Sequence, residues 1–504
     1  MNRLQFVCYL ALTAVCHPAL HASQRPNIVF ILSDDHAWQT VSAYGESRRL
    51  VETPNIDRIA REGMRFDRCL VTNAICGPAR ATILTGKYSH LNGFYNNANG
   101  SFDGSQQTFP KLLQQAGYST LLVGKWHLNS NPTGFTDWDI VQGQGTYYNP
   151  VMIRNGRVQQ QEGYATDVIT DHTIEMLERR DKEKPFLMMC HHKSTHRGWD
   201  PALRHLEADG KRQYPEPATL FDDYEGRGAA EREQEMSIAE DMQGFDVKLS
   251  APATLNAEQR AVWDAHYAAR IEEFRGNKPK GRDLVRWRYQ RYIHDYIACV
   301  RSLDESVGKL LKYLDDNGLA DNTIVVYSSD QGFFLGEHGW FDKRWIFEES
   351  LRTPLVVRWP SVVARNSTND SIVSNLDFAE TFLDAAGVAV PADMQGRSLV
   401  PLLRGEHPAD WRTSFYYHYY EYPEPHRVNP HYGVVTDRYK LVRFYGTGND
   451  YWELFDREAD PQEMKSFWGA AEYQTVQAEL TKELDRLRQE LKVPAVDAEG
   501  AFGN

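Results

Sequence analysis

The sequence is poor in cysteine, in net positive charge and in long apolar runs. Six cysteines in 504 residues are too few for a disulfide scaffold of this size. Aspartate and glutamate number 69 against 56 lysines and arginines, and the net charge of −13 argues against nucleic-acid binding through a broad basic surface. Beyond the N-terminal segment no apolar run is long enough to span a bilayer, so we expect no integral membrane segment.

The N-terminal segment has the pattern of an export signal. Arg3 precedes an apolar stretch over residues 4–15, and small residues follow up to Ala22. A lipoprotein signal fits less well, because valine rather than a small residue precedes Cys16. We therefore predict a signal peptide over residues 1–22 and an exported protein, periplasmic or secreted.

The composition is typical of a folded globular protein, with 41% hydrophobic and 25% charged residues. Apolar β-branched runs alternate with stretches of helical periodicity, which predicts an α/β fold with a large, mainly parallel sheet flanked by helices. The predicted strands cover residues 27–32, 119–123, 185–193, 323–330 and 353–360, and the predicted helices cover 53–63, 165–180 and 292–314.

Two regions depart from this alternation. Residues 201–285 are charged and contain prolines, with only weak helical pieces, so we interpret them as a long insertion on the surface or rim of the site. Residues 415–445 are aromatic and alternating, as in antiparallel strands, and residues 480–493 form a closing helix. We expect a main domain over residues 23–404, which carries the candidate catalytic site, and a smaller C-terminal α+β subdomain over residues 405–504.

Acids, lysines and histidines gather where the predicted strands end. Ligands of open α/β sheets bind outside the carboxyl ends of the strands. One such residue is usually a helix cap or a turn residue, but four strand ends loaded in this way indicate a site. The residues, one group for each strand end, are Asp34 and Asp35; Lys125 and His127; His191, His192, Lys193 and His196; and Asp330 and Gln331.

The chemistry of these side chains indicates a metal and an anion. Carboxylates are hard oxygen ligands, which suit Ca²⁺ or Mg²⁺ better than zinc. Histidines that accompany lysines suit anion binding and proton transfer more than metal binding. A divalent metal surrounded by cationic side chains fits a phosphate or sulfate ester as the substrate.

The segment ICGPARATILTG, residues 75–86, contains the most specific motif. Pro78 suits the first turn of a helix, so Cys76 lies at or just before a helix N-terminus. The free N–H groups and the helix dipole favour an anion there. The alternative is a cysteine that only caps a buried helix, which the spacing C-x-P-x-R before Thr85 and Gly86 disfavours.

The sequence resembles the type I, formylglycine-dependent sulfatases of the alkaline-phosphatase superfamily. The run from Cys76 to Arg80 is similar to the maturation signature of that family, and PNIVFILSDD is similar to its opening metal-binding strand. The resemblance covers nearly all of the chain after the signal peptide. Further motifs follow in the expected order: GKWH (124–127), HHKSTH (191–196), SSDQG (328–332), GEHGWFDKR (336–344) and YKLVRFY to YWELFDREADPQE (439–463).

The resemblance implies that a maturation enzyme converts Cys76 to formylglycine. One hydroxyl of the hydrated aldehyde would attack sulfur and displace the sugar alcohol, and the other would help to expel sulfate. It also implies a Ca²⁺ ion bound by Asp34, Asp35, Asp330 and Gln331 together with the formylglycine oxygen. Gln331 departs from the Asn or His most expected in the family, although a glutamine carbonyl oxygen can also bind calcium.

By the same resemblance, five further side chains act in turnover. Arg80 would orient the diol, and His127 would assist its hydroxyl. Lys125 and Lys343 would bind sulfate oxygens and stabilise charge in the transition state. His196 would be the general acid that protonates the leaving oxygen.

Other residues of the same motifs have open roles. We include Lys193 in the catalytic cluster, although it could lie behind the site, as could its neighbours His191 and His192. Lys343 could instead be a solvated surface lysine. For His338 the sequence favours a structural role.

Substrate choice depends on segments outside this core. Residues 85–98, the insertion and residues 416–433 resemble bacterial N-acetylglucosamine-6-sulfatases, which implies exo-acting removal of the 6-O-sulfate of N-acetylglucosamine in host or environmental glycans. Another sulfated sugar, including one from a marine polysaccharide, is the alternative. The candidate sugar-binding residues are Tyr419, Glu421, His426 and His431, which could instead seal a domain interface.

Two other function classes stay open on the sequence. A phosphatase or phosphodiesterase of the same superfamily would present serine or threonine as the nucleophile and more His and Asp ligands for two zinc ions. A non-catalytic glycan-binding relative would have lost Cys76, Arg80 or the acids, and all of these are present.

Overall fold

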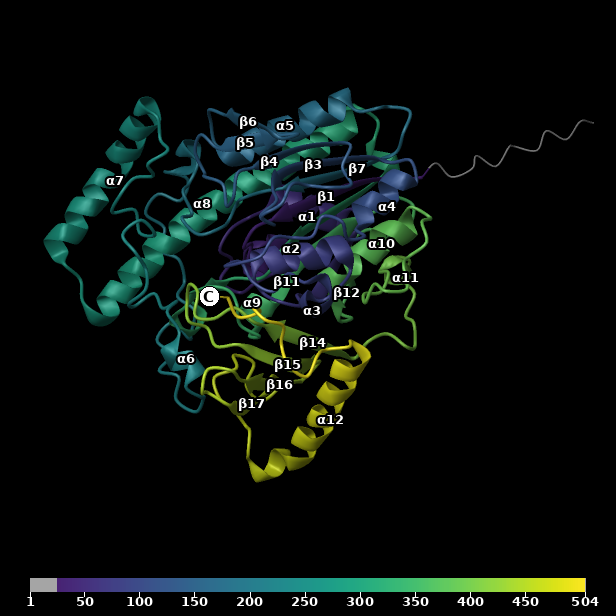
Figure 1. Cartoon of the computed structure of the whole chain (residues 1–504). Helices are drawn as coiled ribbons and strands as arrows, with labels where there is room; N and C mark the ends of the chain where they lie inside the picture. Colours follow the sequence, from purple (N-terminus) through teal and green to yellow (C-terminus); the bar gives the residue numbers. More distant parts are fainter. Residues whose placement is uncertain (1–24, 504) are drawn as a thin grey trace, which may run out of the picture.

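A large mixed sheet runs through the middle of the protein (Figure 1). The computed structural model describes residues 25–503, so the predicted signal peptide lies outside the described residues. Within that range no helix is long and apolar enough to cross a membrane. The eleven strands of this sheet in the described chain are β1 (Asn27–Ser33), β2 (Met64–Leu70), β3 (Ser119–Lys125), β4 (Asp137–Val141), β5 (Val151–Arg154), β6 (Arg157–Gln160), β7 (Phe186–His191), β8 (Thr323–Ser329), β11 (Arg352–Arg358), β12 (Ser367–Asn369) and β13 (Val373–Ser374).

The strands follow the order β12-β2-β11-β8-β1-β7-β3-β4-β5-β6, and β13 also pairs with β2. β1 lies between β8 and β7 and is parallel to both, with Ile28 opposite Ile324 and Leu187. β3 is parallel to β7 and β4, whereas β11 is antiparallel to β8 and β2. The predicted mainly parallel sheet is therefore confirmed, and the strand predicted at 353–360 is one of its antiparallel members.

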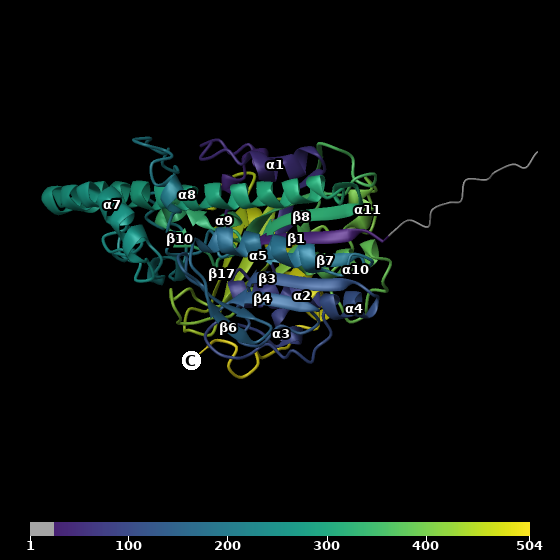
Figure 2. The same cartoon turned by 90° about the horizontal axis from the view of Figure 1, so that it is seen from above.

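Helices cover both faces of the sheet because its central strands are apolar on both sides. Ile28, Phe30 and Leu32 of β1 pack on one face, and Val29 and Ile31 pack on the other. In Figure 2, α1 and α8 lie on the opposite side of β1 and β8 from α2 and α4. The helices of the first face are α2 (Cys76–Thr85), α4 (Phe109–Gln115) and α10 (Phe378–Ala385), and those of the second are α1 (Pro54–Arg61), α5 (Ala165–Arg179) and α8 (Gly281–Asp316).

The predicted insertion contains more regular structure than its sequence indicated. α7 (Ala257–Asn277) is a 21-residue helix, and a capping box between Asn256 and Gln259 closes its N-terminus. α8 is 36 residues long, so the helix predicted over 292–314 begins well before residue 292. Only two side chains of α7 are buried, so its apolar periodicity is too weak to read from sequence. Together α7 and the start of α8 form an arm that projects from the body (Figure 1).

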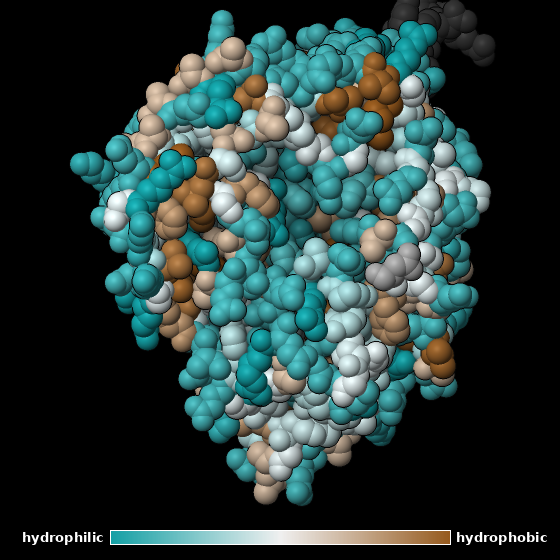
Figure 3. Space-filling view, turned by 60° about the vertical axis from the view of Figure 1, so that its left-hand side comes forward, coloured by the Kyte–Doolittle hydropathy of each residue, from teal (hydrophilic) through white to brown (hydrophobic). Residues whose placement is uncertain are grey.

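The C-terminal part forms a separate antiparallel sheet, as the alternating aromatic pattern predicted. α12 (Gln474–Glu490) packs Leu480, Leu484 and Leu487 against this sheet and is the predicted closing helix. The exact boundary near residue 405 stays a prediction. The surface in Figure 3 is largely hydrophilic and is hollowed near the centre of the view, where hydrophilic side chains line the hollow. The four strands of the C-terminal antiparallel sheet are β14 (Ser414–Tyr419), β15 (His431–Thr436), β16 (Tyr439–Phe444) and β17 (Tyr451–Asp456).

Candidate active site

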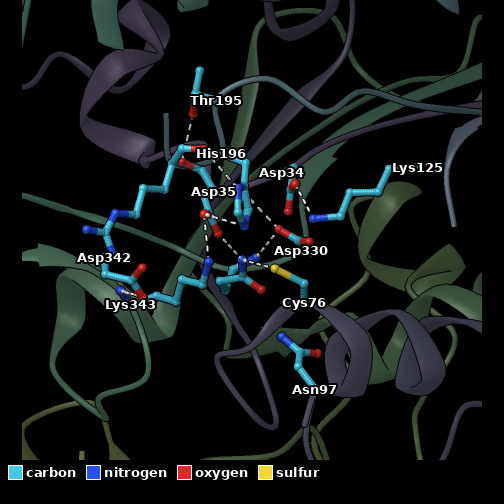
Figure 4. Close-up of polar contacts among 12 residues, drawn as sticks. Asp34, Asp35, Cys76, Asn97, Lys125, Thr195, His196, Asp330, Asp342 and Lys343 are labelled. Carbon is cyan, nitrogen blue, oxygen red and sulfur yellow. Dashed lines mark hydrogen bonds and ion pairs between the residues drawn. The ribbon is translucent and has the colours of Figure 1, made fainter. Parts of the chain in front are cut away.

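Three buried carboxylates meet at the carboxyl ends of β1 and β8. Asp34 and Asp35 follow β1 directly, and Asp330 follows β8, its parallel neighbour. One oxygen from each carboxylate lies within 4.8 Å of the other two, and all three residues are fully buried. The Asp35 N–H donates to Asp330 Oδ1 at 3.1 Å. The strand pairing thus brings together acids that are almost 300 residues apart, as the sequence predicted (Figure 4).

The loop after β7 fixes the backbone of the two consecutive acids. The Asp34 N–H donates to Ser194 O at 2.9 Å, and the Thr195 N–H donates to Asp34 O at 2.6 Å. The hydroxyls of Thr195 and Tyr296 both donate to Asp35 O, at 2.8 and 2.7 Å. Asp35 has a φ of 63°, so these bonds hold it in a conformation that non-glycine residues seldom adopt.

Each carboxylate has a cationic partner. Lys125 Nζ donates to Asp34 Oδ2, and Lys343 Nζ donates to Asp35 Oδ2 at 2.7 Å. Arg80 Nη2 donates to Asp330 Oδ2 at 2.9 Å. Lys125 and Lys343 reach the acids from opposite sides in Figure 4. Lys343 is 2% exposed, so the alternative of a solvated surface lysine is wrong.

These charges shift the pKa values of the acids in different directions. Burial alone would raise the pKa of Asp34, but Lys125, His196 and Arg80 hold it well below its usual range. Burial, reinforced by the charge of Asp34, raises the pKa of Asp330 to about 7. The crowded carboxylates are therefore not equivalent, and their mutual repulsion makes a further positive charge between them favourable.

Cys76 is the first residue of α2, with its side chain fully buried beside the acids. Gln331 Nε2 donates to Cys76 Sγ at 3.7 Å, and the Gly77 N–H donates to Asn97 Oδ1 at 3.0 Å. Burial, followed by the charge of Asp34, raises the pKa of the Cys76 thiol. The unmodified thiol is therefore protonated at neutral pH and a poor nucleophile.

His196, Lys193 and His127 surround the acids from the ends of β7 and β3. His196 Nε2 lies 3.9 Å from Asp35 Oδ2, and its side chain is partly exposed. Lys193 Nζ lies 5.2 Å from the centre of the Tyr147 ring, and burial together with Lys125 lowers its pKa to about 8. His127 has a φ of 55°, and burial followed by Lys125 lowers its pKa well below the usual range.

The two other histidines of the HHKSTH run, His191 and His192, lie behind the acids and contact residues that hold the site in place. His191 Nδ1 lies 3.2 Å from Lys125 O, and it also faces Arg80 at 3.5 Å. His192 Nε2 lies 3.0 Å from Ser306 Oγ on α8. His338 belongs to a different buried group, in which its Nδ1 lies 2.8 Å from Asp222 Oδ2.

Two residues beside Lys343 belong to the site although the sequence did not single them out. Asp342 Oδ2 lies 3.3 Å from His426 Nε2, and Arg344 Nη2 lies 3.9 Å from Glu421 Oε1. Asp342 and Arg344 have φ angles of 83° and 91°, so the turn that presents Lys343 is strained. The acid followed directly by two bases in FDKR was the available signal.

The four predicted sugar-binding residues divide into two pairs. Glu421 and His426 contact the Asp342–Arg344 turn, and Glu421 also accepts the Asn97 N–H at 2.6 Å. His431 is fully buried among aromatic rings, and its Nδ1–H donates to Asn429 O at 2.8 Å. Tyr419 lies beside it, 5.7 Å between ring centres. Among residues 25–503 no hydrogen bond or ion pair links Tyr419 or His431 to the charged cluster.

The donor set fits a hard divalent cation. Asp34 Oδ1 and Gln331 Oε1 are buried and have no hydrogen-bond partner within the described chain. Buried polar atoms are rarely left without a partner, so Asp34 Oδ1, beside the other two carboxylates, marks where a cation would bind. Gln331 Nε2 donates to Asp35 Oδ1, so Gln331 would offer its carbonyl oxygen to the same cation only after its amide turns over. Oxygen donors suit Ca²⁺ or Mg²⁺.

Comparison with known proteins identifies the family. The profile of the family described as "Sulfatase" matches residues 26–388, and that described as "N-sulphoglucosamine sulphohydrolase, C-terminal" matches residues 336–490. The chain belongs to the sulfatase family. This confirms the resemblance found in the sequence, and the protein is a sulfatase enzyme.

Two relatives are similar over nearly the whole sulfatase chain. An N-acetylglucosamine-6-O-sulfatase of Bacteroides thetaiotaomicron is 51% identical over 96% of this chain and 90% of its own. A solved structure in complex with its substrate D-glucosamine-2-N,6-O-disulfate is 50% identical, with a TM-score of 0.92 over 94% of this chain and all of that one. The phosphonate monoester hydrolase of Agrobacterium radiobacter shares the fold at 19% identity, with a TM-score of 0.69 over 93% of this chain and 96% of its own.

Proposed function

We propose that this sulfatase removes the 6-O-sulfate from a terminal N-acetylglucosamine, or a closely related glucosamine, of a sulfated glycan. The observation that carries the proposal is a buried cysteine at a helix N-terminus, facing three carboxylates and three cations. The substrate rests on the similarity to the N-acetylglucosamine-6-O-sulfatase and to the protein bound to glucosamine disulfate. Another sulfated sugar is the alternative.

Two groups complete the proposed site. Formylglycine at position 76 would supply a hydrated aldehyde, whose second hydroxyl avoids the stable sulfate ester that a simple alcohol or thiol would leave. Ca²⁺ held by Asp34, Asp35, Asp330 and Gln331 would supply positive charge for sulfate oxygens. Asp34 Oδ1, which is buried and makes no hydrogen bond within the described chain, supports this proposal, and Gln331 would join the site after its amide turns over.

The chain's own residues bind the sulfate and move the proton. Lys125 and Lys343 each approach one carboxylate and retain donor hydrogens for sulfate oxygens. Arg80 fixes Asp330 through two N–H groups, at 3.1 and 2.9 Å, and so keeps the charged cluster rigid. His196 is a partly exposed imidazole whose Nε2 lies 3.9 Å from Asp35 Oδ2, and from this position it would protonate the leaving sugar oxygen.

We propose that the turn at Asp342 and the side chains that contact it select the sugar. Asp342, Arg344, Glu421 and His426 offer carboxylates, a guanidinium and an imidazole beside Lys343, and sugar hydroxyls need such partners. Arg344 Nε and Nη1 are buried without a hydrogen-bond partner within the described chain.

We also propose that the protein is exported after removal of residues 1–22, and that a maturation enzyme converts Cys76.

A panel of sulfated monosaccharides tests the proposal. N-acetylglucosamine-6-sulfate and glucosamine-2-N,6-O-disulfate are compared with 2-, 3- and 4-sulfated sugars at equal concentration, with sulfate release as the readout. We expect turnover of the 6-sulfated glucosamines above all others. Turnover of a different sulfated sugar alone would reject the proposed substrate and leave the sulfatase activity in place.

A further inference from the structure

The insertion carries a loop that is fixed to both catalytic segments. We define the rim loop as residues 236–249. The Ile238 N–H donates to Gly339 O at 2.8 Å, and the Phe341 N–H donates to Met236 O at 3.0 Å, just before Lys343. At the other end of the rim loop, Lys248 Nζ lies 3.4 Å from Asp200 Oδ1, shortly after His196.

Arg197 joins the rim loop to the residue after the proposed general acid. Its Nε and Nη2 donate to the two oxygens of Asp246 at 2.9 and 2.8 Å, and Asp246 is fully buried. The same guanidinium lies 4.9 Å from the ring centre of Phe341 and 5.2 Å from that of Phe245. Arg197 Nη1 also lies 3.5 Å from His426 Nε2. The rim loop is therefore held rigidly beside the sugar-binding turn.

Phe245 is 47% exposed although the loop that carries it is well anchored. A few other large apolar side chains of the described chain are also exposed, among them Val158, Val262 and Trp468. Phe245 differs from these because its ring stacks on Arg197, which directly follows His196. A single exposed apolar side chain is common on protein surfaces, so the binding role is inferred from the place of the ring, on the guanidinium that also contacts His426.

We propose that Phe245, backed by Arg197, is a stacking platform for the second sugar of the glycan, the unit attached to the sulfated sugar. This inference rests on the proposed exo-acting function. The sulfated sugar would lie against Asp342 and His426, and the next unit would leave across the adjacent rim. Arg197 is neutralised by Asp246, so the platform favours the uncharged C–H face of a sugar ring over a second sulfate.

The test compares one sugar with two. Phe245→Ala, Phe245→Tyr and wild-type enzyme are assayed on 6-sulfated N-acetylglucosamine and on a disaccharide with the same sulfated terminal unit. We expect Phe245→Ala to lower the ratio of kcat/KM for the disaccharide over that for the monosaccharide about threefold to tenfold, the effect of one aromatic contact. Phe245→Tyr should retain the wild-type ratio, because it keeps the ring.

A matched control and clear contrary outcomes complete the experiment. Val262→Ala removes a similarly exposed apolar side chain on α7 and should leave the ratio unchanged. An unchanged ratio for Phe245→Ala, whether both substrates slow equally or neither does, would overturn the platform. If wild-type enzyme prefers another sulfated sugar, the proposed substrate fails, and the monosaccharide and disaccharide of that sugar test the platform separately.

Discussion

Single residues in this site act through opposite charges that are buried together. Lys125, Lys343 and Arg80 pair with the three carboxylates, so the six groups cancel in formal charge before metal or substrate enters. A divalent cation would leave the pocket positive, which suits a sulfate ester with its single negative charge. Whether a bound sulfate ester is hydrolysed then depends on the nucleophile at position 76.

The modification of Cys76 is directly measurable. We expect the peptide that contains residue 76 of active enzyme to be about 18 Da lighter than with cysteine, or of equal mass when the aldehyde is hydrated. Cys76→Ala should keep the wild-type melting temperature and lose at least about 1,000-fold in kcat. Full activity of protein that carries only unmodified cysteine would refute the assignment.

Metal removal tests the carboxylate cluster. Chelation should abolish sulfate release and lower the melting temperature by a few degrees, because the folded protein loses a bound ion and the acids are left to repel one another. Ca²⁺ should restore both properties better than Zn²⁺. Elemental analysis of active enzyme that finds stoichiometric zinc and no calcium would contradict this prediction.

His426 and His431 are close in sequence but should respond differently to substitution. His426→Ala should raise KM for the sugar sulfate and leave slow turnover of a small aryl sulfate nearly intact, because His426 contacts the Asp342 turn. His431→Ala should lower the free energy of unfolding by about 2–4 kcal/mol, because it empties a site among buried rings. Urea unfolding and steady-state kinetics separate the two, and equal kinetic losses on both substrates for His426→Ala would contradict a sugar-binding role.

At the scale of elements, parallel pairing explains why the acids were predictable. Asp34, Asp35 and Asp330 end adjacent strands whose apolar runs are evident in the sequence. Arg344 and Asn97 lie on loops, and Asp342 ends the two-residue strand β10 (Phe341–Asp342). Such segments have no periodic signal, so sequence reasoning missed these three residues. The same limit applies to α7, whose exposed surface hides its helical period.

The helices behind the nucleophile contain a buried acid that makes stability depend on pH. Glu380 of α10 accepts the Gly396 N–H at 2.7 Å, and burial followed by Asp377 raises the pKa of Glu380 to about 8. The unfolded chain releases this proton near pH 4.3, roughly the ordinary glutamate value. Between these pKa values the folded state binds more protons, so stability falls as pH rises, by up to about 1.4 kcal/mol per pH unit.

Glu380→Gln tests this pH dependence, because the amide keeps an acceptor for Gly396 and cannot titrate. We expect the free energy of unfolding of the variant to fall less steeply than that of wild type between roughly pH 5 and 8. Urea unfolding at several pH values gives both curves. Parallel curves would show that Glu380 is ionised in the folded protein.

On the scale of the whole molecule, the C-terminal sheet holds the segment that follows Lys343. Lys440 of β16 is fully buried, and its Nζ donates to Ile346 O at 2.9 Å. It also pairs with Glu463 at 2.7 Å and with Glu348 at 3.0 Å. These contacts, with that of Arg344 to Glu421, make both parts of the chain contribute to one site.

Removing the Lys440 charge should therefore weaken the contact between the C-terminal subdomain and the segment that follows Lys343. Lys440→Met leaves the buried Glu463 and the partly buried Glu348 without this partner, and we expect a loss of about 3–5 kcal/mol in the free energy of unfolding. Lys465→Met, at an exposed position of the same subdomain, is the control and should change stability by less than about 0.5 kcal/mol. A melting temperature equal to that of wild type for Lys440→Met would contradict the structural role.

The sequence by itself determined the alternating fold, the acids at the ends of β1 and β8, and Cys76 at the start of α2. Each of these depends on local signals: apolar periodicity, the residues that follow a strand, and the proline that begins a helix. Only the tertiary structure decided that His426 contacts Asp342 while His431 lies among aromatic rings, and that the rim loop lies beside His196. Those relations depend on which distant segments pack together, and packing is set by the whole chain rather than by neighbouring residues.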